Sequence, residues 1–140
     1  MTPPVKYMLD TNTVSYIIKG NSLAARQKFE AAGEEDEVCI SAITEAEVRY
    51  GLAKRPMNAV VREQIELFLD TIDVQPWDSE AAKEYGRMRA NLEASGRPLA
   101  NMDLLIAAHA SSIGAVLVTN DKAFANVDSA VTVNWTIDVS

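Results

Sequence analysis

The sequence predicts an α/β fold, a three-layer α/β/α sandwich with a mainly parallel central sheet. Short apolar runs alternate with amphipathic segments along the chain, and this alternation is typical of parallel strands covered by helices on both faces. Hydrophobic residues make up 48% and charged residues 24%, as in soluble globular proteins. No internal repeat, low-complexity tract or long linker divides the 140 residues, so we expect residues 1–140 to form a single domain.

Five apolar runs are the candidate strands. Each is short enough for a buried strand, and polar or turn-forming residues follow it. The last run is expected at an edge of the sheet. In chain order, the candidate strands span residues 5–9, 38–40, 71–74, 115–118 and 131–133.

Helical patterns fill the segments between these strands. The first two helices are expected as a pair broken at Gly20 and Asn21, with Gly33 as the C-terminal cap of the second. Pro56 separates the next two, because proline interrupts a continuous helix. The expected helices span residues 13–18, 23–32, 42–53, 58–70, 79–95 and 103–112.

The fifth helix has the clearest pattern. We expect Asp78 to cap its N-terminus, and Gly96 with Pro98 to end it. The helix after it is expected to be capped by Asn101. The face of the fifth helix that should pack against the sheet carries Ala81, Tyr85, Met88 and Leu92.

Composition and charge narrow the class of protein. Cys39 is the only cysteine, so no intramolecular disulfide can form, and we expect it to be a small core residue. The chain starts without a secretory leader pattern, and no apolar run approaches the roughly 18 residues that span a bilayer, so we expect a cytoplasmic protein with no membrane contact.

The formal net charge of −7 opposes nucleic-acid binding unless the acids gather at a site for divalent cations, because bound cations then attract phosphate. Basic residues either lie scattered on the surface or rim such a site. They are Lys19, Arg26, Lys28, Arg49, Lys54, Arg55, Arg87, Arg89 and Arg97.

Two aspartates follow apolar runs that are predicted to be strands. Asp10 comes directly after residues 5–9, and Asp121 stands just beyond residues 115–118. Ligands of open α/β sheets bind at the carboxyl ends of the strands, so we expect both acids at the same edge of the sheet. The alternative for each is a local cap of the helix or turn that follows.

Two further acids occupy inward positions on expected helices. Glu47 shares a helical stripe with Ile43 and Tyr50, and Asp103 begins a helix face rich in small apolar residues. A buried carboxylate without a partner costs several kcal/mol, so a cation is implied. The local alternatives are a capping box between Thr44 and Glu47 and a favourable interaction of Asp103 with its helix dipole.

A single metal site explains these acids together. Mg2+ and Mn2+ take oxygen ligands, and Mg2+ binds through one or two carboxylates, waters and substrate phosphate. Such an ion activates a bound water and neutralises charge on a phosphodiester during in-line attack. The predicted catalytic and metal-binding residues are Asp10, Glu47, Asp103 and Asp121.

Four motifs together resemble a known family. Each motif alone is weak, but their order and intervals cover nearly the whole chain. They resemble a PIN domain of the VapC toxin type. The motifs are MLDTN at residues 8–12, ITEAEVRYG at residues 43–51, GRP at residues 96–98 ahead of DLLIAAHA at residues 103–110, and LVTND at residues 117–121 with Phe124.

The resemblance implies a Mg2+-dependent or Mn2+-dependent endoribonuclease, the toxin of a type II toxin–antitoxin pair that cleaves structured cellular RNA, with tRNA favoured, to arrest translation and growth. It also implies a homodimer and a small VapB-like antitoxin, which often directs a basic side chain toward the acidic pocket. The family's acidic site falls on the four acids named above, with Asp10 and Asp103 holding the metal most directly. Asn12 and Thr119 match polar positions that support the acids.

Three other functions are alternatives. Residues 10–14 superficially resemble the nucleophile loop of haloacid-dehalogenase-type phosphohydrolases, but Asn12 stands where that family needs a second acid. A phospho-accepting receiver module needs an aspartate at the end of the third strand, where Gln75 and Pro76 follow Asp73. The third alternative is a PIN fold used only for binding.

The single histidine and the two tryptophans are expected to serve the structure. His109 lies six residues after Asp103 and off the face of that acid, so we expect it to pack or to form a hydrogen bond. Trp77 and Trp135 lie outside the predicted site segments, and burial or an interface contact is expected for both.

Overall fold

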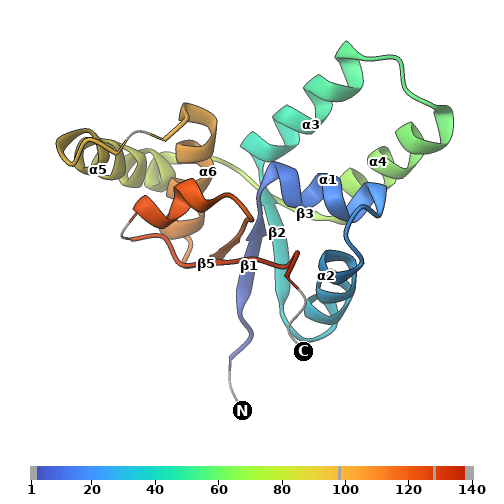
Figure 1. Ribbon diagram of the computed structural model, residues 1–140, viewed down its shortest axis with the longest axis horizontal. Helices are drawn as coiled ribbons and strands as arrows, with labels where there is room; N and C mark the ends of the chain where they lie inside the picture. The colour runs from blue at the N-terminus through green and yellow to red at the C-terminus, as the bar shows by residue number, and fades with distance from the viewer. Residues whose placement is uncertain (1–2, 98, 128, 138–140) are drawn as a thin grey trace.

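Parallel strands form one central sheet in the computed structural model, which describes residues 3–97, 99–127 and 129–137 (Figure 1). The strands of this described part are β1 (Lys6–Leu9), β2 (Glu37–Ser41), β3 (Asp73–Gln75), β4 (Val116–Val118) and β5 (Thr132–Val133). Their order across the sheet is β3-β2-β1-β4-β5, and every pairing is parallel. From β1 the chain adds β2 and β3 on one side of β1, and then β4 and β5 on its other side. The boundary between β1 and β4 is therefore the switch point of the sheet, and ligands of open α/β sheets bind at such a point.

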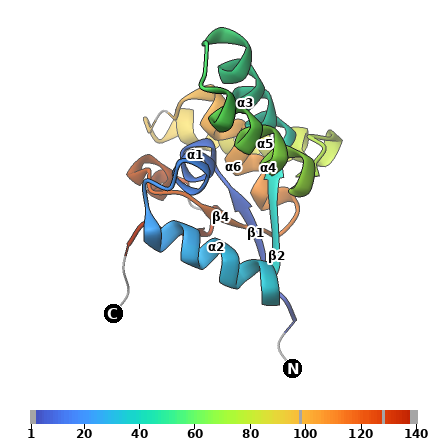
Figure 2. The ribbon, with the colours of Figure 1, turned by 90° about the vertical axis from the view of Figure 1, so that its right-hand side faces the viewer.

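Helices cover both faces of the sheet, which confirms the predicted three-layer sandwich. They are α1 (Thr11–Lys19), α2 (Leu23–Glu35), α3 (Ala42–Lys54), α4 (Ala59–Thr71), α5 (Ser79–Ala94), α6 (Asn101–Ser112) and the short 3-10 helix η1 (Lys122–Asn126). α5 and α6 lie on one side of the strands in Figure 1, and Figure 2 shows α1, α2 and α4 in front of the other side. None of the helices in the described part is long and apolar enough to cross a membrane.

Alternating side chains of the strands feed two separate core layers. Neighbouring residues of a strand point to opposite faces, so Met8 packs in the layer under α5 and α6, and Leu9 in the layer under α1, α2 and α4. Burial raises the pKa of the Cys39 thiol to about 12, which makes it the protonated core residue that the sequence predicts. In the same way, Cys39 of β2 and Leu117 of β4 lie in the layer under α5 and α6, whereas Ile40 and Val118 lie in the opposite layer.

Several helix ends follow the predicted signals. Gly20 ends α1 with a φ of 69°, in the left-handed region that glycine adopts without strain. The Asp78 carboxylate accepts a hydrogen bond from the N–H of Ala81 at 3.1 Å and so caps α5. Gly96 follows α5 with a φ of 68°, and Pro98 lies outside the described residues.

Two predicted caps are wrong. α2 continues through Gly33 to Glu35, and Asp36 follows in an extended conformation with its Oδ1 accepting the N–H of Val5 at 2.9 Å. This contact joins the end of α2 to the residue before β1, 31 positions away, so it could not be predicted from the local sequence around Gly33. Asn101 is the first residue of α6, which begins after Ala100 without a side-chain cap.

The predicted start of the third strand is also wrong. Thr71 ends α4, where its hydroxyl donates to the carbonyls of Leu67 and Phe68 at 3.0 and 3.2 Å. A β-branched threonine ordinarily favours a strand. Here its hydroxyl bonds back to the carbonyls of its own helix, which keeps Thr71 in the last turn of α4. β3 begins two residues later, at Asp73.

Candidate active site

Asp10 and Asp121 lie at neighbouring strand ends, beside the switch point of the sheet. Asp10 follows β1 and is 4% exposed, and its N–H donates to the carbonyl of Val118, the last residue of β4, at 3.0 Å. Asp121 stands three residues beyond Val118 and is exposed. The parallel sheet therefore brings both aspartates to the same edge, as the strand-end rule predicts.

Both aspartates also cap the helix that follows them. Asp10 Oδ1 accepts the N–H of Thr13 at 2.8 Å, and Asp121 Oδ1 accepts the N–H of Ala123 at 2.9 Å. The local capping alternative is therefore correct for one oxygen of each carboxylate. The Oδ2 atoms of the two acids form no hydrogen bond within residues 3–97, 99–127 and 129–137, so capping and ligand binding are compatible here.

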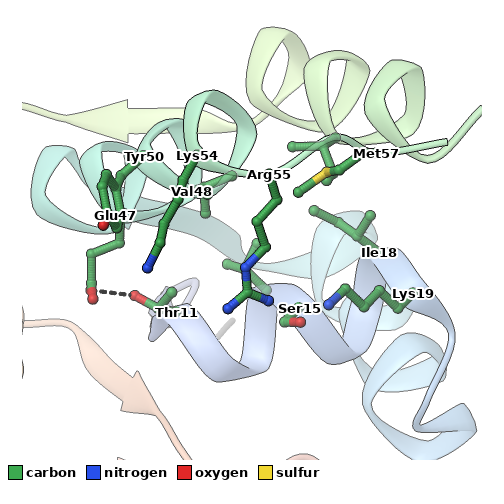
Figure 3. A pocket seen from close by; sticks show the side chains of 13 residues that line it. Thr11, Ser15, Ile18, Lys19, Glu47, Val48, Tyr50, Lys54, Arg55 and Met57 are labelled. Atoms are coloured by element: carbon green, nitrogen blue, oxygen red, sulfur yellow. Dashed lines mark hydrogen bonds between the residues drawn. The ribbon is translucent and has the colours of Figure 1, made fainter. Parts of the chain in front are cut away.

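Glu47 joins the site through a hydrogen bond across two helices. Thr11, the first residue of α1, donates its hydroxyl to Glu47 Oε1 at 2.6 Å (Figure 3). Hydrogen bonds to a charged acceptor are short and strong, and this one holds the carboxylate at Thr11, the residue that follows Asp10 in the chain. The capping-box alternative is wrong, because Ser41 caps α3 by accepting the N–H of Ile43 at 3.1 Å.

The predicted inward stripe of α3 is partly wrong. Tyr50 is 62% exposed, whereas Thr44 and Leu52 are the buried residues of the helix. The buried face therefore follows residues 44, 48 and 52 at i, i+4 and i+8 spacing, and Glu47 lies half-buried at its border. At the border, the carboxylate reaches Thr11 without entering the core.

Asp103 connects all four acids electrostatically. It lies in the first turn of α6, half-buried. Burial raises the pKa of the Asp103 carboxyl, and the negative charges of Asp121, Glu47 and Asp10 raise it further, in that order of strength. Such effects require nearby charges, so the four acids share one neighbourhood.

No cation of the described chain neutralises this neighbourhood. The ion pairs found among residues 3–97, 99–127 and 129–137 all join neighbours three or four positions apart within one helix, such as Arg49 with Glu45 and Arg89 with Glu93. None of them includes the four acids. The four acids therefore have no ion-pair partner within 4 Å in the described residues, which leaves them available to a cation.

The acids fit a hard divalent cation by chemistry, but they are not arranged in coordination geometry. The donors are four carboxylates, the oxygen ligands that Mg2+ and Mn2+ prefer. Within the part of the chain that the structure describes, no three Asp, Glu, His or Cys side chains stand close enough together to hold an ion. Like charges repel, and three of the carboxylates instead accept hydrogen bonds from nearby donors.

Of the two predicted supporting residues, Thr119 contacts an acid of the site, and Asn12 forms no side-chain hydrogen bond within the described residues. Thr119 is 5% exposed, and its hydroxyl accepts the N–H of Asp121 at 3.0 Å, which orders the turn that carries this acid. Asn12 is exposed on the first turn of α1, and its side chain forms no hydrogen bond within the described residues. The role of Asn12 stays a prediction.

Sequence reasoning missed the residues that link the elements of the site. The Thr13 hydroxyl donates to the carbonyl of Val118 at 3.1 Å, and the Asn120 amide donates to the Tyr16 hydroxyl at 3.1 Å. Both bonds tie α1 to the end of β4, more than 100 residues away. Val118 and Asn120 lie inside the motif that contains Asp121, whereas Thr13 and Tyr16 lie beyond the motif that contains Asp10, so nothing in the sequence marks these two as partners.

A groove of about 280 Å3 adjoins the acidic site between α1 and α3 (Figure 3). Thr11 and Glu47 lie at one end of it, and Lys54 lies beside the exposed Tyr50 with its Nζ 5.4 Å from the ring centroid. The groove thus combines an apolar floor with a basic rim. The floor consists of Val14, Ile18, Val48, Met57 and Ile65, and the rim of Lys19, Lys54 and Arg55.

Comparison with known proteins identifies relatives of the whole chain. The model of the PIN domain family matches residues 7–130. The chain is 37% identical to the "tRNA(fMet)-specific endonuclease VapC" of Shigella flexneri, over 94% of this chain and 98% of that protein. It is 32% identical to "Ribonuclease VapC2" of Rickettsia felis, over 92% and 97%.

A solved structure has the same fold. The crystal structure of VapBC2 from Rickettsia felis bound to a DNA fragment from its promoter superposes with a TM-score of 0.87 at 31% identity, covering 94% of this chain and 99% of that chain.

Proposed function

The chain belongs to the PIN domain family, and from this premise we propose that it is a metal-dependent endoribonuclease, the toxin of a type II toxin–antitoxin pair. Relatives named as VapC ribonucleases match it over nearly their whole length, which supports the ribonuclease activity. The observation that carries the proposal for the site is the action of three other carboxylates on Asp103. Family membership removes the dehalogenase-like and receiver alternatives and leaves a non-catalytic PIN domain as the rival.

The cofactor in this proposal is Mg2+, with Mn2+ as a substitute. Asp10 and Asp103 would hold the ion most directly, and Glu47 and Asp121 would complete the site. When bound, the ion supplies an activated water and charge neutralisation at the phosphodiester.

The residues of the chain orient these acids. The N–H of Thr13 orders Asp10, the hydroxyl of Thr11 holds Glu47, and Thr119 orders the turn before Asp121. The bonds to Asp10 and Glu47 lower the number of side-chain conformations that these acids must lose when a cation binds, and such preorganised acids are typical of metal sites.

The substrate in this proposal is structured cellular RNA, with tRNA favoured. The Shigella flexneri relative is named for initiator tRNA, so this RNA is the first to test. Cleavage of tRNA would arrest translation and growth, as the toxin role requires.

A small VapB-like antitoxin is the partner in this proposal, and the Rickettsia felis structure contains such a complex. We expect the antitoxin to cover the groove between α1 and α3, because the apolar floor suits apolar side chains and the rim of Lys19, Lys54 and Arg55 suits acidic ones. A basic side chain at the Glu47 end would then compensate the acids. A homodimer and a location in the cytoplasm stay predictions.

The test is cleavage of labelled initiator tRNA by the purified protein in Mn2+ and in EDTA. We expect cutting only with Mn2+, and its loss in Asp10→Asn with the fold retained. Asp70→Asn is the matched control, because Asp70 is an exposed aspartate of α4 outside the site. Folded protein that binds antitoxin but cuts no RNA in Mn2+ would support the non-catalytic rival. Release of phosphate from small phosphomonoesters without RNA cutting would contradict the proposal altogether.

A further inference from the structure

A buried serine–histidine pair joins the helices that carry Glu47 and Asp103. Ser41 is the last residue of β2 and the N-cap of α3, and His109 lies in α6. The Nδ1 atom of His109 stands 2.7 Å from the Ser41 hydroxyl oxygen. Ser41 is 0% and His109 1% exposed. The expected structural role of His109 is therefore a specific hydrogen bond to the start of another helix.

The Ser41 hydroxyl bonds to both the backbone of α3 and the His109 ring. The Ser41 oxygen accepts the N–H of Ile43 at 3.1 Å, which leaves its own hydrogen free to donate. Burial lowers the pKa of His109, so the imidazole is neutral at neutral pH. A neutral ring carries its proton on one nitrogen, so the bond forms with the Ser41 hydroxyl donating to Nδ1 in one tautomer and with Nδ1–H donating to the Ser41 oxygen in the other. A continuous chain of hydrogen bonds thus runs from the first turn of α3 to α6.

The pair stands at the base of two helical arms. Glu47 follows Ser41 by six residues, and Asp103 precedes His109 by six residues. With a rise of 1.5 Å per residue, each acid lies about 9 Å along its helix from the pair. The two helices also pack against each other near the pair, because Ile43 of α3 contacts the core cluster that contains Leu104 and Ala107 of α6.

We propose that the Ser41–His109 hydrogen bond is a positioning device that sets the spacing between Glu47 and Asp103, an inference that rests on the proposed function. A tilt of α3 by about 5° about its N-cap would move a group about 9 Å away by roughly 0.8 Å. A misplacement of about 1 Å at a reacting centre costs on the order of 100-fold in rate. The bond joins residues 68 positions apart and adds a directional contact to the apolar packing of Ile43 against α6.

Thr44 provides a matched control in the same part of the fold. It lies on the first turn of α3, is 0% exposed, and its hydroxyl forms no hydrogen bond within the described residues. Thr44→Val therefore removes a buried hydroxyl from α3 without touching the pair. Any effect of His109 variants that Thr44→Val shares would reflect general repacking of this helix.

The test measures Mn2+ affinity by isothermal titration calorimetry together with thermal unfolding in EDTA. We expect His109→Leu to weaken Mn2+ binding by about tenfold or more, as loss of an outer partner of a metal site does. His109→Asn places an amide group near the position of Nδ1, which can accept from or donate to the Ser41 hydroxyl, so we expect it to restore affinity to within about threefold of the wild type. Thr44→Val should bind Mn2+ as the wild type does. Wild-type affinity in His109→Leu, or equal losses in His109→Leu and Thr44→Val, would overturn the inference.

A measurement on the unchanged protein keeps the inference testable if His109→Leu does not fold. His109 is the only histidine, so the imidazole nitrogen signals in an NMR spectrum belong to it. We expect a hydrogen-bonded Nδ1 whose signal moves when Mg2+ is added, because an ion held by Glu47 and Asp103 would shift α3 relative to α6. A signal indifferent to Mg2+ would overturn the inference. Wild-type protein that neither binds Mn2+ nor cuts RNA would instead refute the proposed function.

Discussion

The Asp103→Asn variant should be more stable than the wild type in EDTA and less stable than the wild type in Mn2+. The pKa of Asp103 in the folded chain is raised by burial and by three other acids, so folding favours the protonated form. For such an acid, the penalty of ionisation is fully present above the folded pKa and disappears as the pH falls through it. At neutral pH, the charge of Asp103 therefore lowers the free energy of unfolding. The asparagine side chain would keep the shape of the carboxylate and remove its charge.

The expected change in stability is smaller in EDTA than in Mn2+. Asp103 is half-buried, so solvent screens much of the repulsion, and we expect Asp103→Asn to gain up to about 1 kcal/mol in EDTA. A ligand at 100 times its Kd stabilises the wild type by about 2.7 kcal/mol. For a domain of this size, about 1 kcal/mol corresponds to roughly 4 °C in Tm, so Mn2+ should raise the wild-type Tm by about 10 °C. Asp103→Asn loses a direct ligand and should keep less than about 3 °C of this shift.

Thermal unfolding followed by circular dichroism at pH 7.5 tests the reversal. The variant should melt above the wild type in EDTA and below it in Mn2+. Asp70→Asn should match the wild type in both buffers, because Asp70 is exposed on α4. A variant that is less stable than the wild type in EDTA would mean that the four acids do not repel one another. A wild-type Tm that ignores Mn2+ would mean that the acids do not form a cation site.

Three further predictions follow from individual contacts. Thr11→Val removes the 2.6 Å hydrogen bond to Glu47, so RNA cleavage should fall by about tenfold, and the free energy of unfolding by about 1.5–3 kcal/mol; cleavage at the wild-type rate would show that Glu47 needs no such support. Burial lowers the pKa of His109, so the unfolded chain binds more protons and stability should fall as the pH drops below about 6.5. Urea midpoints at pH 7.5 and 5.5 should therefore differ more in the wild type than in His109→Gln, and equal differences would contradict the buried neutral ring. Lys54→Glu reverses a charge on the rim of the groove and should weaken antitoxin binding by about tenfold in calorimetry while cleavage of free RNA continues; unchanged antitoxin affinity would place the partner elsewhere.

Much of the fold and part of the site could be predicted from the sequence. A strand buried on both faces consists of a short apolar run, so the run that contains Met8 and Leu9 predicts a central strand with a core layer on each side. Parallel strands share one carboxyl edge, so Asp10 and Asp121 could be placed together without coordinates. Glu47 and Asp103 were predicted from their inward positions on expected helices, and the motifs of the PIN family agree with this choice.

The orientation of individual helices came only from the structure. Apolar periodicity locates a helix, but each residue turns by about 100°, so an error of one position exchanges a buried side chain for an exposed one. Tyr50 and Thr44 exchange places in this way relative to the predicted stripe of α3. Gly33 likewise stays inside α2, because a contact of Asp36 with the distant Val5 decides where the chain turns.

The sequence by itself determined the succession of strands and helices along the chain, the two-sided core and the edge where the acids lie, because these depend on local patterns and on the general geometry of parallel sheets. Only the tertiary structure decided which side chains hold the acids. The bonds from Thr11 to Glu47 and from Ser41 to His109 span 36 and 68 residues. Such bonds depend on how whole helices pack, and packing sums many weak contacts that no short stretch of sequence contains.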